Sequence, residues 1–331
     1  MFNVPQNYKK IPTGRSHAQI FFLMSVFAYN GNQYLCTMTD QMMPISMSRI
    51  LRTRPPEAHK GTLGHALLVA GRLGVGGCAV LAAESCLRAG VGKLSVCTPE
   101  CNRLLVQWSV PEAILQVLPS QGTLSGSCEA GSAAPWQAIG IGPGIGLDAG
   151  ALLHDVLHTW STLPMVIDAD ALRILAAHPQ WMTSLRGRAV LTPHGGEMAA
   201  LARGILGEEL AGSDSEGLQT AAQHLAREYQ VWVVLKGHPS RVYHPHGPIS
   251  LCPRGNAGMA TAGAGDVLTG IIAGLLAQGY SLPEAACLGV WLHASAGDEA
   301  ARRLGQEAML ARDITAHLSH AWQELHEIRN R

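Results

Sequence analysis

Short apolar runs alternate with helical repeats along most of the chain, and this alternation is the feature that most restricts its fold. HALLVAG (65–71) ends in glycine and predicts a buried strand, residues 76–90 have helical periodicity, and KLSVCTPE (93–100) predicts a second strand. Parallel strands need a crossover of this kind between them. The beginning of the pattern therefore predicts a parallel sheet.

The same alternation continues towards the C-terminus. Further strand-like runs lie at 137–146, 164–172, 189–197 and 231–237, with helical segments at 147–160 and 217–230. Residues 240–253 predict an edge hairpin, and residues 266–279, 282–305 and 311–328 predict three C-terminal helices. Strands that alternate with helices place helices on both faces of the sheet. No repeat or low-complexity linker divides residues 50–330, so we expect one α/β domain.

The composition excludes several classes of protein. Of 331 residues, 47% are hydrophobic and 15% are charged, and the formal net charge is zero. Such a chain buries a large core and is not disordered. Its neutral balance gives no electrostatic signature for nucleic acid or for an anionic membrane, so we expect neither partner.

The eight cysteines are scattered, and Cys97 and Cys101 form a CxxxC without the paired spacing of a zinc knuckle. We therefore expect buried thiols and a cytoplasmic location.

The N-terminal segment does not follow the strand–helix pattern. IFFLMSVFA (20–28) is too short to span a bilayer. Basic residues precede it, which leaves a signal peptide as an alternative, but no A-x-A cleavage site follows. We favour an N-terminal extension over residues 1–47, from a misplaced start codon, followed by a single domain over residues 48–331.

Several polar or glycine-rich segments come directly after predicted strands. They are residues 71–78, 142–146, 168–170, 192–197 and 236–240. The carboxyl ends of parallel strands meet at one edge of a sheet, where open α/β proteins bind their ligands. We expect one functional site at this edge.

The stretch GNAGMATAGAGDVLTG (255–270) places glycines around one carboxylate, Asp266, at the start of a predicted helix. Backbone N–H groups at a helix N-terminus bind anions, and small residues let the backbone approach them. A helix cap alone would need one residue rather than the run from Gly263 to Gly265. We therefore favour a phosphate site beside a functional carboxylate.

Other pairs of residues leave alternatives open. Asp168 and Asp170 end a strand and either bind magnesium or cap the next helix. His194 and Glu197 either contact a substrate and a magnesium-bound water or form a capped turn. Lys236 either meets a phosphate or is a solvated surface lysine.

Two better-known nucleotide motifs are not supported. VGKL lacks the Ser or Thr of a phosphate-binding P-loop. GIGPGIG (140–146) contains GxGxxG only loosely, because Pro143 lies inside it. A Rossmann-type hydride-transfer enzyme is therefore disfavoured.

Six motifs in order resemble one family. HKGTLGHALLVAG, IGIGPGIG, VIDADAL, LTPHGGE, VVLKGH and GNAGMATAGAGDVLTGIIAGLLAQG together resemble the ADP-dependent NAD(P)H-hydrate dehydratases of the ribokinase-like superfamily. The resemblance extends over about residues 48–320. It implies a three-layer α/β/α sandwich with a mostly parallel central sheet.

The resemblance also implies a reaction. It points to a carbon–oxygen lyase that dehydrates the S-form of NADH hydrate and NADPH hydrate, using ADP and releasing AMP and phosphate, with Mg²⁺ assisting. Asp266 would be the catalytic base. The alternative is an ATP-dependent kinase of the hydroxyethylthiazole kinase type, which would use the same carboxylate and stop at the phosphorylated product.

The family motifs assign site residues by position. The hydrate would contact Cys78, Gly144, Gly146, His194 and Asp266. The adenine nucleotide would contact Lys236, Gly237, His238, Pro239, Ser240 and Gly265. The anion hole would consist of Ala262, Gly263, Ala264 and Gly265, and Glu197 would reach the metal through water.

Some positions depart from the family pattern. They are Arg72, Cys78, Arg173, Ser240, Ala262 and Ala264. Arg72 is the largest change because it adds charge near a phosphate-rich ligand, and we expect altered affinity rather than lost activity. The resemblance further implies a homo-oligomer, namely a tetramer. It also implies a separate hydrate epimerase as partner, because only about fifty residues precede the match.

Overall fold

One ten-stranded sheet forms the centre of the protein in the computed structural model, which describes residues 39–118 and 135–331. The strand order is β1-β10-β9-β8-β7-β6-β5-β2-β3-β4. The strands are β1 (Thr39–Gln41), β2 (His65–Val69), β3 (Lys93–Pro99), β4 (Ile114–Leu118), β5 (Ala138–Ile141), β6 (Met165–Ile167), β7 (Ala189–Leu191), β8 (Trp232–Leu235), β9 (Ser240–Tyr243) and β10 (Ile249–Cys252).

The sheet is parallel except at β9, which is the one reversed strand among those described. Every residue of β2 and β5 is buried, as expected for strands covered on both faces. The helices that cover them are α1 (Pro44–Ile50), α2 (Gly77–Arg88), α3 (Arg103–Ser109), α4 (Gly150–Thr159), α5 (Ala169–Ala177), α6 (Gly195–Leu201), α7 (Ser215–Tyr229), α8 (Ala264–Ala277), α9 (Leu282–Leu304), α10 (Ala311–Ala316) and α11 (Leu318–Asn330).

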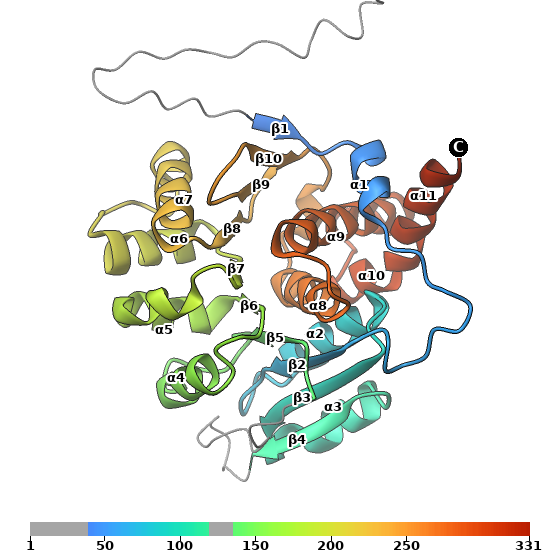
Figure 1. Ribbon diagram of the computed structural model, residues 1–331, viewed down its shortest axis with the longest axis horizontal. Coiled ribbons are helices and arrows are strands. Elements are labelled where there is room, and N and C mark those ends of the chain that lie inside the picture. The colour runs from blue at the N-terminus through green and yellow to red at the C-terminus, as the bar shows by residue number, and fades with distance from the viewer. Residues whose placement is uncertain (1–38, 119–134) are drawn as a thin grey trace, which may run out of the picture. The chain divides into compact units, whose positions relative to one another are not determined.

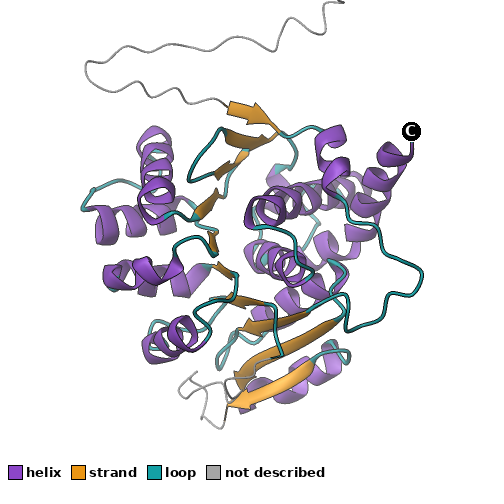
Figure 2. Ribbon diagram, viewed as in Figure 1, coloured by secondary structure: helices purple, strands orange, loops and turns teal. Residues whose placement is uncertain are grey.

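Helices lie on both sides of the sheet, in three layers (Figure 2). Helices α4 to α7 cover one face, and α2, α8 and α9 cover the other (Figure 1). Each face has its own apolar core. The predicted α/β/α sandwich with a mostly parallel sheet is confirmed.

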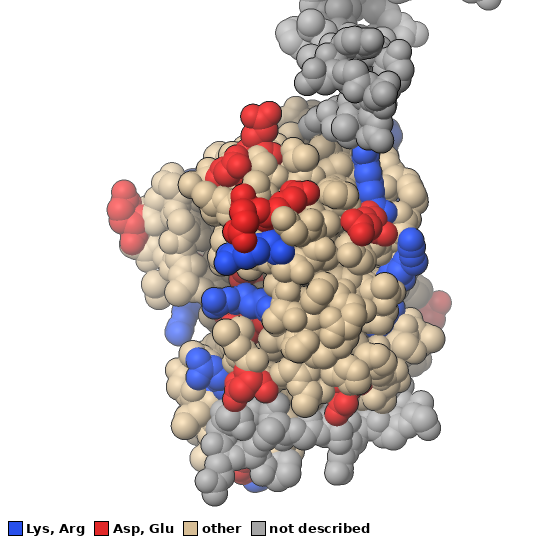
Figure 3. All heavy atoms as spheres, turned by 90° about the vertical axis from the view of Figure 1, so that its left-hand side faces the viewer, with Lys and Arg blue, Asp and Glu red and all other residues tan. Residues whose placement is uncertain are grey.

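Charged side chains of both signs are interspersed over the face formed by α4 to α7 (Figure 3). This distribution agrees with the neutral balance of the sequence. No helix in the described part of the chain is both long and apolar enough to cross a membrane.

The C-terminal and N-terminal ends of the domain differ from our expectations. Residues 311–328 form two helices rather than one, with a break at His317 between α10 and α11. The hairpin β9–β10 is not at the edge of the sheet, because β1 pairs with β10 outside it.

The compact unit runs from Thr39 to Arg331, so it begins earlier than the boundary we placed at residue 48. The physical reason is that Met42 and Met47 bury their side chains in the core around α9 and α11. The segment 20–28 lies outside the described residues.

The cysteines fall into two groups. Cys97 is disulfide-bonded. The free thiols are Cys78, Cys86, Cys101, Cys252 and Cys287. No group of three or more potential metal ligands occurs among the described residues.

Candidate active site

A cavity of about 660 Å³ lies at the carboxyl ends of β6, β7 and β8, against the N-terminus of α8. It collects residues from four of the segments that the sequence singled out, namely 168–170, 192–197, 236–240 and 255–270. Its lining includes Asp168, His194, Glu197, Lys236, Gly237, His238, Ser240, Ala264, Gly265 and Asp266. Two of the predicted segments, 71–78 and 142–146, contribute no lining residue, so one site that includes all of the segments stays a prediction.

Helix α8 begins at the glycine-rich stretch. Gly263 occupies the N-cap position with a φ of 92°, a left-handed conformation that favours glycine. A Cβ atom at Gly263 would also clash with Leu81 of α2. The stretch therefore brings the first turn of α8 close to α2 while leaving its N–H groups at the cavity.

Asp266 lies in this first turn and is partly buried. Burial is the main factor that raises its pKa, to about 7, and the charge of Asp168 raises it further while Lys236 opposes the shift. Within the described part of the chain, no side chain donates a hydrogen bond to the Asp266 carboxylate. Asp266 is thus a carboxylate that can exchange a proton near neutral pH, as a general base must.

Lys236 is held by two carboxylates at the end of β8. Its Nζ lies 2.7 Å from Oδ1 of Asp168 and 3.4 Å from Oε2 of Glu197. Burial alone would lower the pKa of Lys236, but the two carboxylates raise it above its ordinary value. Lys236 is therefore a fixed cation rather than the solvated surface lysine that we kept as an alternative.

The two aspartates of VIDADAL have separate tasks. Asp168 is 1% exposed and accepts hydrogen bonds from Lys236 and from Oγ1 of Thr269, at 2.8 Å. Asp170 accepts from the backbone N–H of Gly146 at 2.9 Å. Neither side chain caps helix α5. Asp168 instead connects the end of β6 to Lys236 after β8 and to α8, and Asp170 connects it to the loop after β5.

His194 and Glu197 form the cap of α6 and line the cavity as well. Nδ1 of His194 accepts from the N–H groups of Gly196 and Glu197, at 3.0 and 3.3 Å. Oε2 of Glu197 accepts in return from the N–H of His194 at 2.9 Å. Because Nδ1 is an acceptor, a neutral imidazole carries its hydrogen on Nε2, which lies 3.3 Å from Oε1 of Glu197 at the cavity. The capped turn and the functional interpretation are compatible here.

The predicted hydrate contacts Cys78 and Gly144 lie next to each other. Sγ of Cys78 donates to the carbonyls of Val75 and Pro143, at 2.7 and 3.2 Å. Burial raises the pKa of the Cys78 thiol to about 12, and the nearby charge of Asp266 adds to that rise. The Cys78 thiol is thus uncharged at neutral pH. Some predicted residues do not line the cavity itself, namely Cys78, Gly144, Gly146, Pro239, Ala262 and Gly263.

Sequence reasoning missed two residues of α9: His293, which lines the cavity, and Asp298, which does not line it but holds the loop before α8. His293 is held 2.9 Å from the carbonyl of Ala264 through Nε2, and burial lowers its pKa to about 4, so it stays neutral and donates. Asp298 accepts from the N–H of Gly255 and from Asn256, which fixes the loop before α8. Their only sequence signal was their position in a long apolar helix.

Arg254 is a further lining residue without a sequence signal. Its guanidinium lies 4.4 Å above the Trp291 ring and donates to Glu324 of α11 and to Ser295 of α9. These partners tie the loop that precedes α8 to two C-terminal helices.

Comparison with known proteins decides which family has this arrangement. Residues 66–320 match the model of the NAD(P)H-hydrate dehydratase family. The chain belongs to this family. The match covers well over half of the 331 residues, and it includes every strand that carries a predicted site residue.

Two relatives illustrate the range of NAD(P)H-hydrate dehydratase sequences. A bifunctional NAD(P)H-hydrate repair enzyme of Moorella thermoacetica is 39% identical over 285 residues, which are 84% of this chain and 52% of that protein. An ADP-dependent (S)-NAD(P)H-hydrate dehydratase of Neisseria meningitidis is 37% identical over 254 residues, 75% of this chain and 81% of that protein. The chain spans about half the length of the bifunctional relatives.

Solved structures confirm the predicted ribokinase-like fold. An ADP/ATP-dependent NAD(P)H-hydrate dehydratase from Bacillus subtilis, co-crystallised with ATP and Mg²⁺, superimposes with a TM-score of 0.69 at 28% identity, covering 86% of this chain and 97% of that one. A ribokinase-like superfamily protein from Enterococcus faecalis gives 0.73 at 25% identity, covering 90% and 100%.

Proposed function

We propose that this chain dehydrates (S)-NADH hydrate and (S)-NADPH hydrate to NADH and NADPH, with ADP as co-substrate and AMP and phosphate as products. It would therefore be a carbon–oxygen lyase that repairs a damaged cofactor. The observation that carries the proposal is the position of Asp266, whose pKa is about 7, in the first turn of α8 beside Gly265 and Lys236.

The chemistry needs both a base and a phosphate site. Hydroxide is a poor leaving group, so the hydrate is first phosphorylated: Asp266 takes the hydroxyl proton, and the oxygen attacks the terminal phosphoryl group of ADP, which releases AMP. Phosphate then leaves with the electrons of the carbon–oxygen bond. The neighbouring carbon loses a proton, and the ring double bond of the reduced nicotinamide is restored.

The described residues suit these two tasks. A Cβ atom at Gly265 would lie 3.3 Å from Nζ of Lys236, so the first N–H groups of α8 and a fixed cation point to the same place. Such groups stabilise charge on a transferring phosphoryl group. We assign the anion hole to residues 262–265 and the adenine nucleotide to residues 236–240, and His194 is positioned to donate from Nε2 to the hydrate.

Magnesium fits this site through the nucleotide rather than through a protein cage. Asp168 and Glu197 both engage Lys236, and no cluster of three metal-ligating side chains occurs within residues 39–118 and 135–331. Mg²⁺ usually keeps several waters and binds phosphates. Glu197 would orient one of these waters, and the ion would neutralise phosphate charge.

The test is recovery of the reduced ring. Purified protein is incubated with NADH hydrate, Mg²⁺ and ADP, and the near-ultraviolet absorbance of NADH is followed while AMP and phosphate are measured. We expect stoichiometric recovery, and we expect Asp266→Asn to lower the rate by about 100-fold or more while adenine nucleotide still binds. Absence of recovery with both ADP and ATP would disprove the dehydratase proposal.

The same assay separates the kinase alternative. A small-molecule kinase would consume ATP with an alcohol such as hydroxyethylthiazole and leave a phosphorylated product. Consumption of nucleotide without return of NADH absorbance would favour that alternative.

The proposal includes a homo-oligomer, with a tetramer as the expected state. On α3, Leu104 and Trp108 are 78% and 91% exposed, an unusual position for two large apolar side chains. Sedimentation of the wild type and of Trp108→Asp tests this surface. We expect the variant to be smaller, and an unchanged sedimentation coefficient would exclude α3 from the interface.

A separate hydrate epimerase and a cytoplasmic location complete the proposal. The epimerase would supply the S-form from the other epimer, and a mixture of both hydrates should be consumed completely only when an epimerase is added. A reducing compartment would preserve the five free thiols of the described residues, whereas the disulfide at Cys97 argues against such a compartment. Cell fractionation tests the location.

A further inference from the structure

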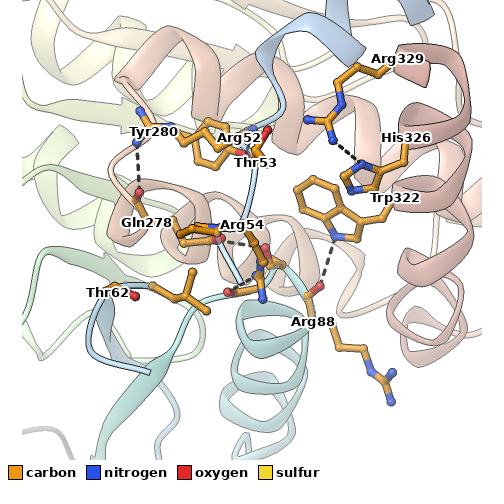
Figure 4. Close-up of a pocket in the computed structure, with 14 residues that line it drawn as sticks. Arg52, Thr53, Arg54, Thr62, Arg88, Gln278, Tyr280, Trp322, His326 and Arg329 are labelled. Carbon is orange, nitrogen blue, oxygen red and sulfur yellow. Dashed lines mark hydrogen bonds between the residues drawn. The ribbon is translucent and has the colours of Figure 1, made fainter. Parts of the chain in front are cut away.

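A second cavity, of about 740 Å³, lies at the end of the sheet opposite the candidate active site. It is bounded by residues 52–55, the end of α2, the α8–α9 turn and α11, as Figure 4 shows. Residues 62–63 and 88–90, which precede β2 and β3, also line it, so it faces the amino ends of the parallel strands. Nothing in the proposed reaction uses this cavity.

Four arginines line the cavity, and one of them, Arg88, pairs with Glu84 at 3.7 Å. Arg54 donates to the carbonyl of Gly90, and Arg329 donates to the carbonyl of Leu51, at 3.3 Å, and contacts His326 at 3.2 Å. Neither arginine forms an ion pair within the described residues. Arg52 has only a long contact of 3.8 Å with Glu284, and both side chains are largely exposed.

The backbone contacts do not use up these guanidinium groups. Arg52 and Arg54 donate to carbonyls that follow α8 and α2, so part of their role is to cap these helices. A guanidinium has five N–H donors, however, and a carbonyl partner neutralises none of its charge. Several donors and the positive charge therefore remain available to a ligand.

The lowered pKa of His326 reflects the same excess of positive charge. Burial lowers its pKa first, and Arg329 and Arg54 lower it further. Its ring stacks on Trp322 with a centroid distance of 6.4 Å, and Nε1 of Trp322 donates to the carbonyl of Arg88 at 3.2 Å. The wall between Arg54 and Arg329 is thus ordered by contacts from α11 and the end of α2.

We propose that this cavity binds a phosphate group of a small phosphorylated metabolite between Arg54 and Arg329. Guanidinium groups pair with phosphate through charge-assisted hydrogen bonds, which are stronger than bonds between neutral groups. The volume is that of a pocket for a small organic ligand, so the phosphate belongs to a larger molecule rather than to a free ion.

Tryptophan resonances test the proposal at a defined place. Full-length protein is labelled with 5-fluorotryptophan, and the Trp322 signal is assigned with Trp322→Phe. Trp291, which lies under Arg254, serves as the reporter for the active-site cavity. Ribose 5-phosphate and inorganic phosphate are titrated separately.

We expect saturable movement of the Trp322 signal, at lower concentrations of ribose 5-phosphate than of inorganic phosphate. Arg54→Gln combined with Arg329→Gln keeps side-chain donors but removes both charges, and should weaken binding at least tenfold. Arg186→Ala, which changes an exposed arginine that precedes β7 and does not line this cavity, is the control and should bind as the wild type does.

Three results would overturn the proposal. The first is a ligand-induced shift of the Trp291 signal without a shift of Trp322. The second is an unchanged affinity for ribose 5-phosphate in the folded double Gln variant. The third is a Trp322 shift that accompanies a change in the sedimentation coefficient, which would report an interface between copies of the chain. If the double variant does not fold, the wild type decides: binding at Trp322 must weaken as sodium chloride is raised, because the contact is ionic.

Discussion

Asp266 combines two requirements that usually conflict. The negative charges of Asp168 and Glu197 raise its pKa. Lys236 forms ion pairs with both of these carboxylates and partly offsets their effect. Burial and the neighbouring charges raise its pKa to about 7 from an ordinary 3.8. The carboxylate is therefore a stronger base than a free aspartate, and it is still ionised in about half of the molecules at neutral pH.

This pKa predicts an acid limb in the pH profile. Because the base must be ionised, we expect kcat/KM for the hydrate to fall about tenfold per pH unit below pH 7 and to level off above it. Initial rates with ADP between pH 5 and 9 give the profile. A flat profile between pH 5 and 7 would show that another group accepts the proton.

The raised pKa of Asp266 also makes the stability of the folded protein depend on pH. Asp266 in the folded protein binds a proton between pH 4 and 7 that the unfolded chain releases, so its contribution favours the folded state at the acid end and is lost as pH rises towards 7.

Asp168→Asn should move the acid limb to lower pH. The substitution removes the strongest neighbouring negative charge, and it frees Lys236 from its closest partner, so both effects favour ionised Asp266. The maximal rate is also expected to fall, because Lys236 loses its position. The matched control is Asp155→Asn, an exposed residue of α4, which should leave the midpoint unchanged. A midpoint that moves upward in Asp168→Asn would contradict the electrostatic account.

The residue scale also shows what a sequence can predict about such a site. Asp266, Lys236 and Glu197 were identifiable because each follows a strand or begins a helix in a recognisable order. The partnership of Asp168 with Lys236 was not, since the two residues come from strands separated by 68 positions in the chain. His293 gave no signal, because a neutral, buried histidine in α9 has the same pattern as any core residue.

At the scale of elements, α2 and α8 pack against each other with glycines of α8 facing the backbone of α2. Gly270 faces the carbonyl of Ala82 and the hydroxyl of Ser85, and Gly274 faces the carbonyl of Cys86 at the next turn. Small residues four apart let two backbones touch. The same helix pair includes α8, whose first turn lines the cavity.

Gly270→Ala should therefore destabilise the protein although alanine is the better helix former. Its methyl group would overlap backbone and hydroxyl atoms of α2, and overpacking of this kind costs about 1–3 kcal/mol of the free energy of unfolding. Thermal unfolding followed by circular dichroism measures the effect. Gly150→Ala in α4 is the control: its nearest neighbour would be 3.9 Å away, and we expect a change within about 1 kcal/mol.

The strand and helix pattern was predictable because each βα unit repeats the same periods, and the strands from β2 to β8 lie where expected apart from β4. The break at His317 was not, since α10 and α11 form a continuous apolar pattern. Strand β1 was also missed, because three residues give no periodicity and depend on β10 for their hydrogen bonds.

At the scale of the whole molecule, the first described residues complete the core. Met42, Met47 and Leu51 are 3%, 6% and 7% exposed, and α1 packs on α9 and α11. The carbonyl of Leu51 also accepts from Arg329. No sequence pattern joins this segment to the domain, because its partners in α9 and α11 lie more than two hundred residues further along the chain.

A chain that starts at Arg52 should therefore unfold at a lower temperature than one that starts at Thr39. Exposing three buried apolar side chains costs about 1.5–3 kcal/mol each, so we expect a difference of at least about 5 °C in the unfolding temperature. Calorimetry of the two chains measures it, with Met43→Ser, an exposed residue of the same segment, as the control. Equal unfolding temperatures would show that residues 39–51 add nothing to the core.

The contact between α2 and α8 has a consequence for how the active site can change. Helix α2 starts beside Cys78, a proposed hydrate contact, and helix α8 starts at the proposed phosphate site, so their contact would set the separation between the proposed acceptor and phosphoryl donor. Glycine against backbone leaves no room for one helix to slide along the other. The contact between the two helices therefore fixes the spacing of the two proposed reactants. Selection for a different acceptor would have to act on the loops at 71–76 and 142–146 while leaving the helix pair unchanged.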